Sequence, residues 1–267
     1  MKISEGADHG NVISRRDWGY ICVLLGIGFL TRVLFFSQIY LISIDGAFQY
    51  IPVAKLFAWG QYREALGQLQ LPLFPYLIAL VSKVAGNFEL SGQMISLFAS
   101  VLAVIPLFVL GKFVFGEAPA FWASIFYLFN PDMLQRSVDV LKEGLLILLL
   151  FCGVLLFYLF LTRKRILLLV GSMIVTLLAS LTRVASLMLI PVFIFWVFFL
   201  RRSPFDVSLS KRLGYIVVII ALCAAIVVPL MMNARAVTGK WDIGKKRITA
   251  RDLIESIFFD KTVNLGG

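Results

Sequence analysis

The stretch LKEGLLILLLFCGVLLFYLFLTRKRILLLVGSMIVTLLASLTRVASLMLIPVFIFWVFFL, residues 141–200, decides the fold class. Its few charges gather near its start, at the basic triplet 163–165 and at Arg183. A membrane-spanning helix needs about 20 apolar residues, so the triplet ends one span at 141–162. The rest of the stretch would be about 50 Å long as a single helix. Because a bilayer core measures only ~30 Å, we expect a break near Arg183.

The composition of the whole chain agrees with a membrane protein. Of the 267 residues, 60% are hydrophobic and 15% are charged, and the mean hydropathy is +0.93. Soluble domains average about 45–50% apolar and about 25% charged residues. The net charge of +10 is typical of basic cytoplasmic loops. No basic stretch carries the interleaved aromatics of a nucleic-acid binder, so nucleic acid is not an expected partner.

Histidine and cysteine chemistry is excluded by position. The single histidine, His9, lies in the polar N-terminal tail. Cys22, Cys152 and Cys223 all lie within apolar stretches, where cysteine behaves as a small buried hydrophobe rather than as part of a disulfide frame.

We therefore predict an all-α polytopic membrane protein with about seven transmembrane helices. The predicted spans are 18–40, 91–111, 118–134, 141–162, 166–182, 184–200 and 213–232. Basic residues favour cytoplasmic loops, and the basic clusters reach one side together only if the apolar segment 72–85 does not cross. The N-terminus is then cytoplasmic and the C-terminus external.

The domain boundaries follow from this topology. Residues 1–17 form a cytoplasmic tail, 18–232 a transmembrane module, and 233–267 a short basic external tail. The first external loop, 41–90, contains a predicted interfacial helix at 47–59, because its apolar residues recur at helical spacing. Trp59 and Tyr62 suit the headgroup depth of a membrane.

Ionisable residues collect at the external helix ends of this topology. Asp45 opens the first loop, where the pair Asp45-Gly46 is typical of a turn or an N-cap, and the sequence alone favours the cap. Arg183 suits binding of a phosphate by its planar donor fork, although an arginine at this depth can also reach the headgroups.

A second group of charges follows the predicted span 118–134. Asp139 and Glu143 are four residues apart, so on one helix they would share a face, together with Arg136. Lys142 lies beside them. Two interpretations remain open: a self-neutralising helix start, or a polar site at the membrane surface.

The order of these motifs resembles the GT-C glycosyltransferases. These membrane enzymes use polyprenyl-phosphate-linked sugars and include the family 39 protein mannosyltransferases and the lipid A aminoarabinose transferases. Residues 45–62 (DGAFQYIPVAKLFAWGQY) and 71–76 (LPLFPY) resemble the family's first external loop. Residues 111–116 (GKFVFG) resemble its cytoplasmic turn, 135–146 (QRSVDVLKEGLL) its second acidic motif, and 180–183 (SLTR) an outer helix end.

The resemblance implies a function and a role for each site residue. It implies transfer of a sugar from a polyprenyl-phosphate donor to a lipid, glycan or protein acceptor in the cell envelope, at the outer face of a prokaryotic inner membrane. Asp45 would be the catalytic base, and inversion at the sugar carbon would follow. The implied substrate-binding residues are Tyr50, Arg136, Asp139, Lys142, Glu143 and Arg183.

No cofactor is certain from the resemblance. Asp139 and Glu143 would orient the acceptor or hold a divalent metal ion through their oxygens. Arg183, helped by Arg136 or Lys142, would hold the lipid phosphate.

Two other functions are open at this point. The chain could be a non-catalytic GT-C-like subunit that supports a partner subunit, or a transporter or flippase for lipid-linked saccharides. A transporter typically places polar residues near the membrane midplane, whereas here they gather at one face.

Overall fold

The computed structural model describes residues 14–37, 42–68, 71–199 and 207–238. Within these ranges the chain is helical and has no strand, which confirms the all-helical part of the predicted fold class. The helices are α1 (Arg15–Phe36), η1 (Gly46–Tyr50), α2 (Ile51–Ala58), α3 (Tyr62–Gln68), α4 (Leu73–Ala85), α5 (Phe88–Leu102), α6 (Val104–Phe115), α7 (Glu117–Phe129), α8 (Pro131–Ser137), α9 (Glu143–Arg163), α10 (Ile166–Ser180), η2 (Val184–Met188), α11 (Leu189–Phe199) and α12 (Leu209–Thr238).

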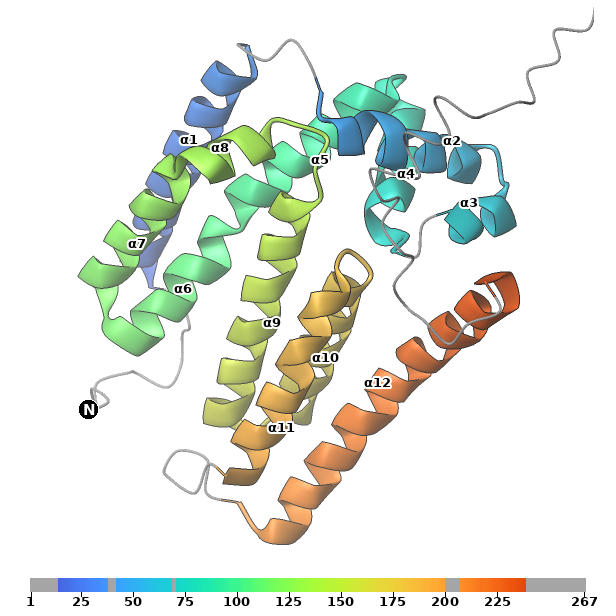
Figure 1. Cartoon of the computed structure of the whole chain (residues 1–267). Helices are drawn as coiled ribbons and strands as arrows, with labels where there is room; N and C mark the ends of the chain where they lie inside the picture. Colours follow the sequence, from blue (N-terminus) through green and yellow to red (C-terminus); the bar gives the residue numbers. More distant parts are fainter. Residues whose placement is uncertain (1–13, 38–41, 69–70, 200–206, 239–267) are drawn as a thin grey trace, which may run out of the picture.

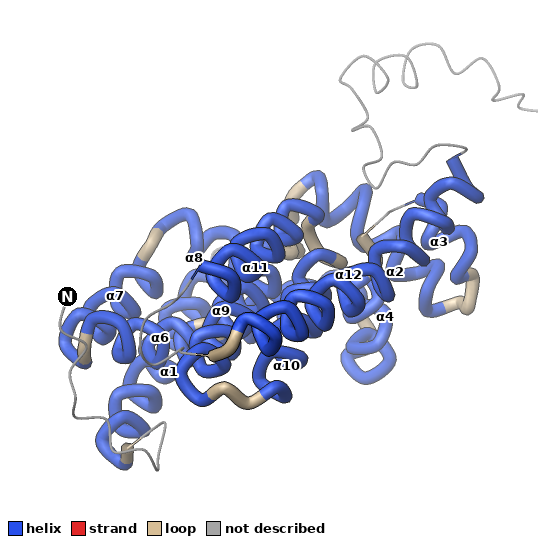
Figure 2. The backbone as a smooth tube through the Cα atoms, turned by 90° about the horizontal axis from the view of Figure 1, so that it is seen from below, coloured by secondary structure: helices blue, strands red, loops and turns tan. Residues whose placement is uncertain are grey.

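The helices lie in three groups from one side of the molecule to the other. Helices α1, α6 and α7 form one side, α9, α10 and α11 the middle, and α2, α3 and α4 the opposite side (Figure 1). The view in Figure 2 keeps this order. Helices α2, α3 and α8 lie at the same end of the long helices, and we call this end the loop face.

Four helical segments are long and apolar enough to cross a membrane: Arg15–Phe36, Phe88–Phe115, Glu143–Arg163 and Leu209–Pro229. The chain is therefore an integral membrane protein. Helix α10 and the η2–α11 segment are apolar but shorter, and α7 has 13 residues. The count of seven spans is not confirmed and stays a prediction.

Proline interrupts two of the predicted spans, which also differ from the prediction at their ends. The predicted span 118–134 ends at Phe129, because Asn130 accepts the Met133 N–H as an N-cap and Pro131 starts α8. The predicted span 91–111 is longer, from Phe88 to Phe115. It changes direction after Leu102, whose carbonyl has no N–H four residues on because residue 106 is proline.

The predicted span 18–40 corresponds to α1, which is longer at its start and ends at Phe36. Ser14 caps this helix in a capping box with Asp17. Residues 38–40, where the predicted span ends, lie outside the described ranges.

Helix α4 corresponds to the apolar segment that we predict does not cross the membrane. Its 13 residues rise by about 20 Å, which is less than a ~30 Å bilayer core. The Leu73 N–H donates to the Leu181 carbonyl, 3.3 Å away, so α4 begins beside the α10–α11 turn. It does not reach the end of the molecule opposite the loop face (Figure 1).

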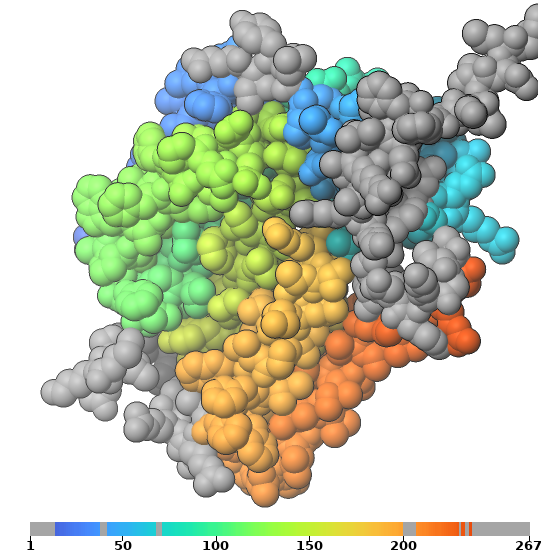
Figure 3. Space-filling view, viewed as in Figure 1, coloured from blue at the N-terminus to red at the C-terminus, as the bar shows by residue number. Residues whose placement is uncertain are grey.

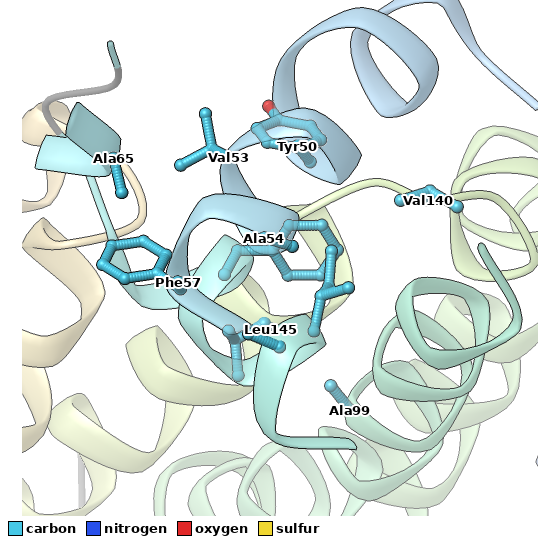
Figure 4. Packing of buried hydrophobic residues seen from close by; sticks show 11 residues of the cluster. Tyr50, Val53, Ala54, Phe57, Ala65, Ala99, Val140 and Leu145 are labelled. Carbon is cyan, nitrogen blue, oxygen red and sulfur yellow. The ribbon is translucent and has the colours of Figure 1, made fainter. Parts of the chain in front are cut away.

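Three apolar clusters hold the helices together. The first joins α2, α3 and α4, which we call the loop helices, to α5 and the start of α9. It includes Tyr50, Phe57, Ile78, Ala99 and Leu145 (Figure 4). The second joins α9, α10, α11 and α12, and the third joins α1, α6 and α7. On the face seen in Figure 3, α11 and α12 lie side by side below the loop helices.

Glycine allows α9 to start directly against α5. A Cβ atom on Gly144 would lie 2.6 Å from the Ser96 carbonyl oxygen and 3.3 Å from the Ser100 backbone nitrogen. Both of these are backbone atoms, so neither can turn aside as the end of a side chain can. The first turn of α9 therefore has its place because residue 144 has no side chain.

We expect Gly144→Ala to destabilise the protein by about 1–3 kcal/mol, since it forces α5 and α9 apart. The measurement is the thermal unfolding midpoint in detergent. Gly19→Ala in α1 is the control, because a Cβ there meets nothing within 4 Å and alanine favours a helix. Equal midpoints for the two variants would contradict the close approach.

Candidate active site

The segment between α8 and α9 is a loop of bends and a turn, so one sequence-based prediction was wrong. Asp139 and Glu143 do not share a helical face, because α8 ends at Ser137 and α9 starts only at Glu143. Val140 fills the space between two glycines: Cβ atoms on Gly46 and Gly92 would lie 2.8 and 2.6 Å from its side chain. Packing of Val140 against η1 and α5 favours the loop over a continuous helix.

The Asp139 carboxylate binds the backbone of the first loop. Its two oxygens accept the Ser43 N–H at 3.0 and 3.2 Å, and Oδ1 also accepts the Val140 N–H at 2.6 Å. Hydrogen bonds to an ionised acceptor are stronger than those between neutral groups. Asp139 thus connects two segments that are 96 residues apart in sequence.

Asp45 is not the N-cap that the sequence favoured. Ser43 takes this position: its hydroxyl accepts the Gly46 N–H at 3.2 Å and its carbonyl accepts the Ala47 N–H at 3.0 Å. The Asp45 side chain makes no capping bond. It is exposed, and its Oδ1 accepts a hydrogen bond of 2.9 Å from Gln49.

A π-helical turn, η1, connects Asp45 to Tyr50. Residue 52 is proline and offers no N–H to the Phe48 carbonyl, so the Ile51 N–H bonds to Gly46 and widens the turn. The predicted helix 47–59 is therefore found as η1 and α2, with this irregularity at its start.

Tyr50 is a buried aromatic residue of the first loop that contacts Phe74 and Lys142. Its ring is buried, packs edge-on against Phe74 at 5.2 Å, and carries the Lys142 Nζ over its face at 5.7 Å. In Figure 4 its hydroxyl points away from Ala99 and Leu145. The Tyr50 hydroxyl is thus a polar group at the edge of an otherwise apolar cluster.

Three charged groups act electrostatically on the Tyr50 phenol. Burial, and then the negative charges of Asp45 and Glu143, raise the pKa of the Tyr50 phenol well above its usual value, while Arg183 acts in the opposite direction. The phenol is therefore a neutral hydrogen-bonding group at any physiological pH. The charges that act on it come from three separate parts of the chain.

Glu143 and Arg136 form an ion pair between the end of α8 and the start of α9. The Arg136 Nη1 lies 3.7 Å from Glu143 Oε1, and its Nε lies 2.9 Å from the exposed Asp132. Glu143 is mostly buried, and its Oε2 has no hydrogen-bond partner among the described residues. One oxygen of this carboxylate is therefore left to bind another group.

Arg183 lies where the chain turns between α10 and η2, as the sequence predicted. Helix α10 ends at Ser180, and Arg183 has an extended backbone before the short 3₁₀ turn. Its side chain is exposed and has no ion pair within the described part of the chain. The neighbouring Leu181 contacts the start of α4, which brings this turn to the external loop.

The metal site predicted at Asp139 and Glu143 lacks a third side-chain ligand among the described residues. Among the residues that the structure describes, no three His, Cys, Asp or Glu side chains come together as metal ligands. Asp139 binds Ser43, and Glu143 pairs with Arg136. We therefore derive no step through a metal ion.

Sequence reasoning missed three polar residues that build this region. Ser43 starts the helix that carries Asp45, Gln49 binds Asp45, and Ser96 on α5 holds the loop through its hydroxyl, 2.6 Å from the Leu141 carbonyl. Serine and glutamine are too common at helix ends to be singled out. The spacing of Asp45 and Gln49, four residues apart, was the one available signal.

Comparison with known proteins gives one finding. The family model described as dolichyl-phosphate-mannose-protein mannosyltransferase matches residues 70–232, which is more than half of the chain. The match contains Arg136, Glu143 and Arg183, and begins after Asp45 and Tyr50. No curated protein and no solved structure matches the chain.

We expect Asp139→Ala to lower the free energy of unfolding by about 1.5–3 kcal/mol, because it removes the charged acceptor to which the Ser43 amide donates a hydrogen bond. Hydrogen exchange of residues 43–50 should accelerate in the same variant. Asp132→Ala is the matched control, since an exposed ion pair contributes about 1 kcal/mol or less. Unchanged exchange at 43–50 would show that Asp139 does not hold the loop.

Proposed function

The chain belongs to the dolichyl-phosphate-mannose-protein mannosyltransferase family, and we propose that it transfers a sugar from a polyprenyl-phosphate donor to an acceptor hydroxyl at the outer face of the membrane. The family supports a membrane glycosyltransferase of GT-C type. The donor, the side of the membrane and the catalytic base are our proposal.

One observation carries the proposal. Burial, and then the carboxylates of Asp45 and Glu143, raise the pKa of the Tyr50 phenol and the guanidinium of Arg183 lowers it, so all three charges lie near enough to act on Tyr50. Sugar transfer from a lipid phosphate needs a base for the acceptor and a cation for the leaving phosphate. Both kinds of group are present on one face.

The reaction has a simple balance. The acceptor oxygen attacks the anomeric carbon while the bond from this carbon to the phosphate oxygen breaks. The acceptor proton passes to the Asp45 carboxylate, and the bonding electrons leave with the polyprenyl phosphate. Attack opposite the leaving group inverts the configuration at the sugar carbon.

The cations have the role of stabilising the leaving phosphate. The exposed guanidinium of Arg183 suits two phosphate oxygens at once. Lys142, whose Nζ lies over the Tyr50 ring, and Arg136, which pairs with Glu143, are the assisting cations. Because a phosphate leaves readily as an anion, it needs little protonation, so one carboxylate base suffices.

Glu143 has the role of orienting the acceptor. Its Oε1 is paired with Arg136, whereas its buried Oε2 has no partner within the described ranges. A buried carboxylate oxygen without a partner is costly, and an acceptor hydroxyl would satisfy it. Tyr50, as a neutral phenol, is a further hydrogen-bonding group for sugar or acceptor.

We expect Asp45→Asn to lower kcat by about 10²–10⁴-fold, the usual contribution of a general base. The assay follows transfer of labelled sugar from a panel of polyprenyl-phosphate sugars by the purified protein. Glu89→Gln is the control, since Glu89 is an exposed carboxylate at the start of α5.

Three results would contradict this proposal in different ways. Full activity of Asp45→Asn removes Asp45 as the base. An equal loss in Glu89→Gln makes the effect nonspecific. Donor binding without turnover by the wild-type protein favours the non-catalytic subunit.

The orientation in the membrane has its own test. We expect a cysteine replacing the exposed Lys83 to react only from outside, and one replacing Arg163 only from the cytoplasm, because basic loops stay inside. Membrane-impermeant maleimide labels each variant in a background without the three native cysteines. Labelling of Lys83→Cys from the cytoplasm alone would overturn the placement of α4.

A further inference from the structure

Arg32 is a fully buried charge in a membrane-spanning helix. It lies on α1, about 25 Å from Arg15 along the helix, and therefore near the loop face. It is the largest fully buried side chain of the described residues, and no carboxylate pairs with it there. Arginine stays charged in proteins, and a charge at this depth is costly unless it has a function.

The guanidinium of Arg32 connects three helices. Its Nε donates to Ser100 Oγ on α5 at 3.0 Å, and its Nη1 to the Leu128 carbonyl on α7 at 3.2 Å. Weaker bonds of Nη1 reach Gly28 and Thr31 on its own helix. Its Nη2 is buried with no partner in the described part of the chain.

The Leu128 contact stabilises the end of α7. The carbonyls of a final helical turn carry partial negative charge and favour a nearby cation. Here Pro131 follows and starts α8, the short helix that presents Arg136. Arg32 therefore holds the point from which α8 leaves α7.

The Ser100 contact reaches the start of α9. On the side of α5 where Gly144 packs, a Cβ on Gly144 would lie 3.3 Å from both the Ser100 nitrogen and its Cβ. Tyr127 donates its hydroxyl to the Ser100 carbonyl at 3.0 Å. A shift of Ser100 would therefore move the first turn of α9, where Glu143 lies.

We propose that Arg32 is a positioning residue that fixes Arg136 and Glu143 relative to the first loop. It does not touch substrate, because its side chain is closed off by α1, α5 and α7. The inference rests on the proposed function for its kinetic consequence only. Its geometric consequence can be measured without any activity.

Arg212 provides a matched comparison. It too is a buried arginine that binds carbonyls at a helix end, with Nη1 3.1 Å from the Phe198 carbonyl and Nε 3.0 Å from the Val207 carbonyl. These contacts lie at the end of α11 opposite the loop face. Loss of either arginine disturbs a helix end, but only Arg32 contacts Ser100, against which α9 starts.

The experiment compares Arg32→Met with Arg212→Met in the full chain, in a background without native cysteines. Spin labels at the exposed Phe48 on η1 and Gln135 on α8 report the distance between the first loop and α8. We expect Arg32→Met to shift or broaden this distance distribution and Arg212→Met to leave it as in the parent. Ser100→Ala, which removes one acceptor, should give a smaller change in the same direction.

The kinetic readout adds a second criterion. We expect kcat of Arg32→Met to fall about tenfold or more with little change in KM for the donor, because small displacements of reacting groups cost rate. Arg32→Lys, which keeps the charge but loses the planar fork, should recover part of it. If Arg32→Met does not fold, Ser100→Ala and Arg32→Lys decide.

An unchanged distance distribution in the folded Arg32 and Ser100 variants would overturn the proposal, as would an equal effect of Arg212→Met. An altered distribution in a protein that transfers no sugar keeps the positioning role and contradicts only the proposed function.

Discussion

The hydrogen bond from the Ser43 amide to the Asp139 carboxylate is the interaction on which the candidate site depends. It joins the loop before α9 to the segment after α1, which no helix connects directly. Ser43 in turn starts the short helix that carries Asp45 and Tyr50. Without this contact, the first loop and the segment that carries Asp139 and Glu143 would not be held in a fixed position relative to each other.

Close packing makes the same junction rigid. Val140 lies directly against Gly46 of the first loop and Gly92 of α5, and Gly144 brings α9 against the same face of α5. Close approaches of this kind leave little room for one segment to shift alone. The polar contact selects the partners, and the packing sets their distance.

The site combines opposite charges around a neutral centre. Tyr50 stays protonated because it is buried beside two carboxylates, so it contributes hydrogen bonding without charge. Glu143 retains a buried oxygen without a partner among the described residues, and Arg183 is exposed at a turn. A site of this kind suits an acceptor hydroxyl and a phosphate, the two groups that a lipid-linked sugar reaction brings together.

The sequence predicted those features that depend on composition and local pattern. The apolar runs predicted a helical membrane protein, since only helices and closed barrels satisfy backbone groups in a bilayer. The length of the run after residue 165 predicted the break at Arg183. The order of motifs predicted the family, which the match over residues 70–232 confirms.

Where local pattern was the only guide, tertiary contacts decided otherwise. Helical spacing placed Asp139 and Glu143 on one face, but packing of Val140 opened a loop between them. The Asp-Gly pair favoured a cap, but the cap is Ser43, because Asp139 holds its amide.

By itself, the sequence determined that this protein lies in a membrane, that it is helical and which family it belongs to. These properties follow from the hydropathy and the order of the residues along the chain. Only the tertiary structure decided which charges act on Tyr50 and which arginine is buried between α1, α5 and α7. The physical reason is that both depend on segments far apart in sequence, held together by close backbone approaches and buried hydrogen bonds that no local pattern displays.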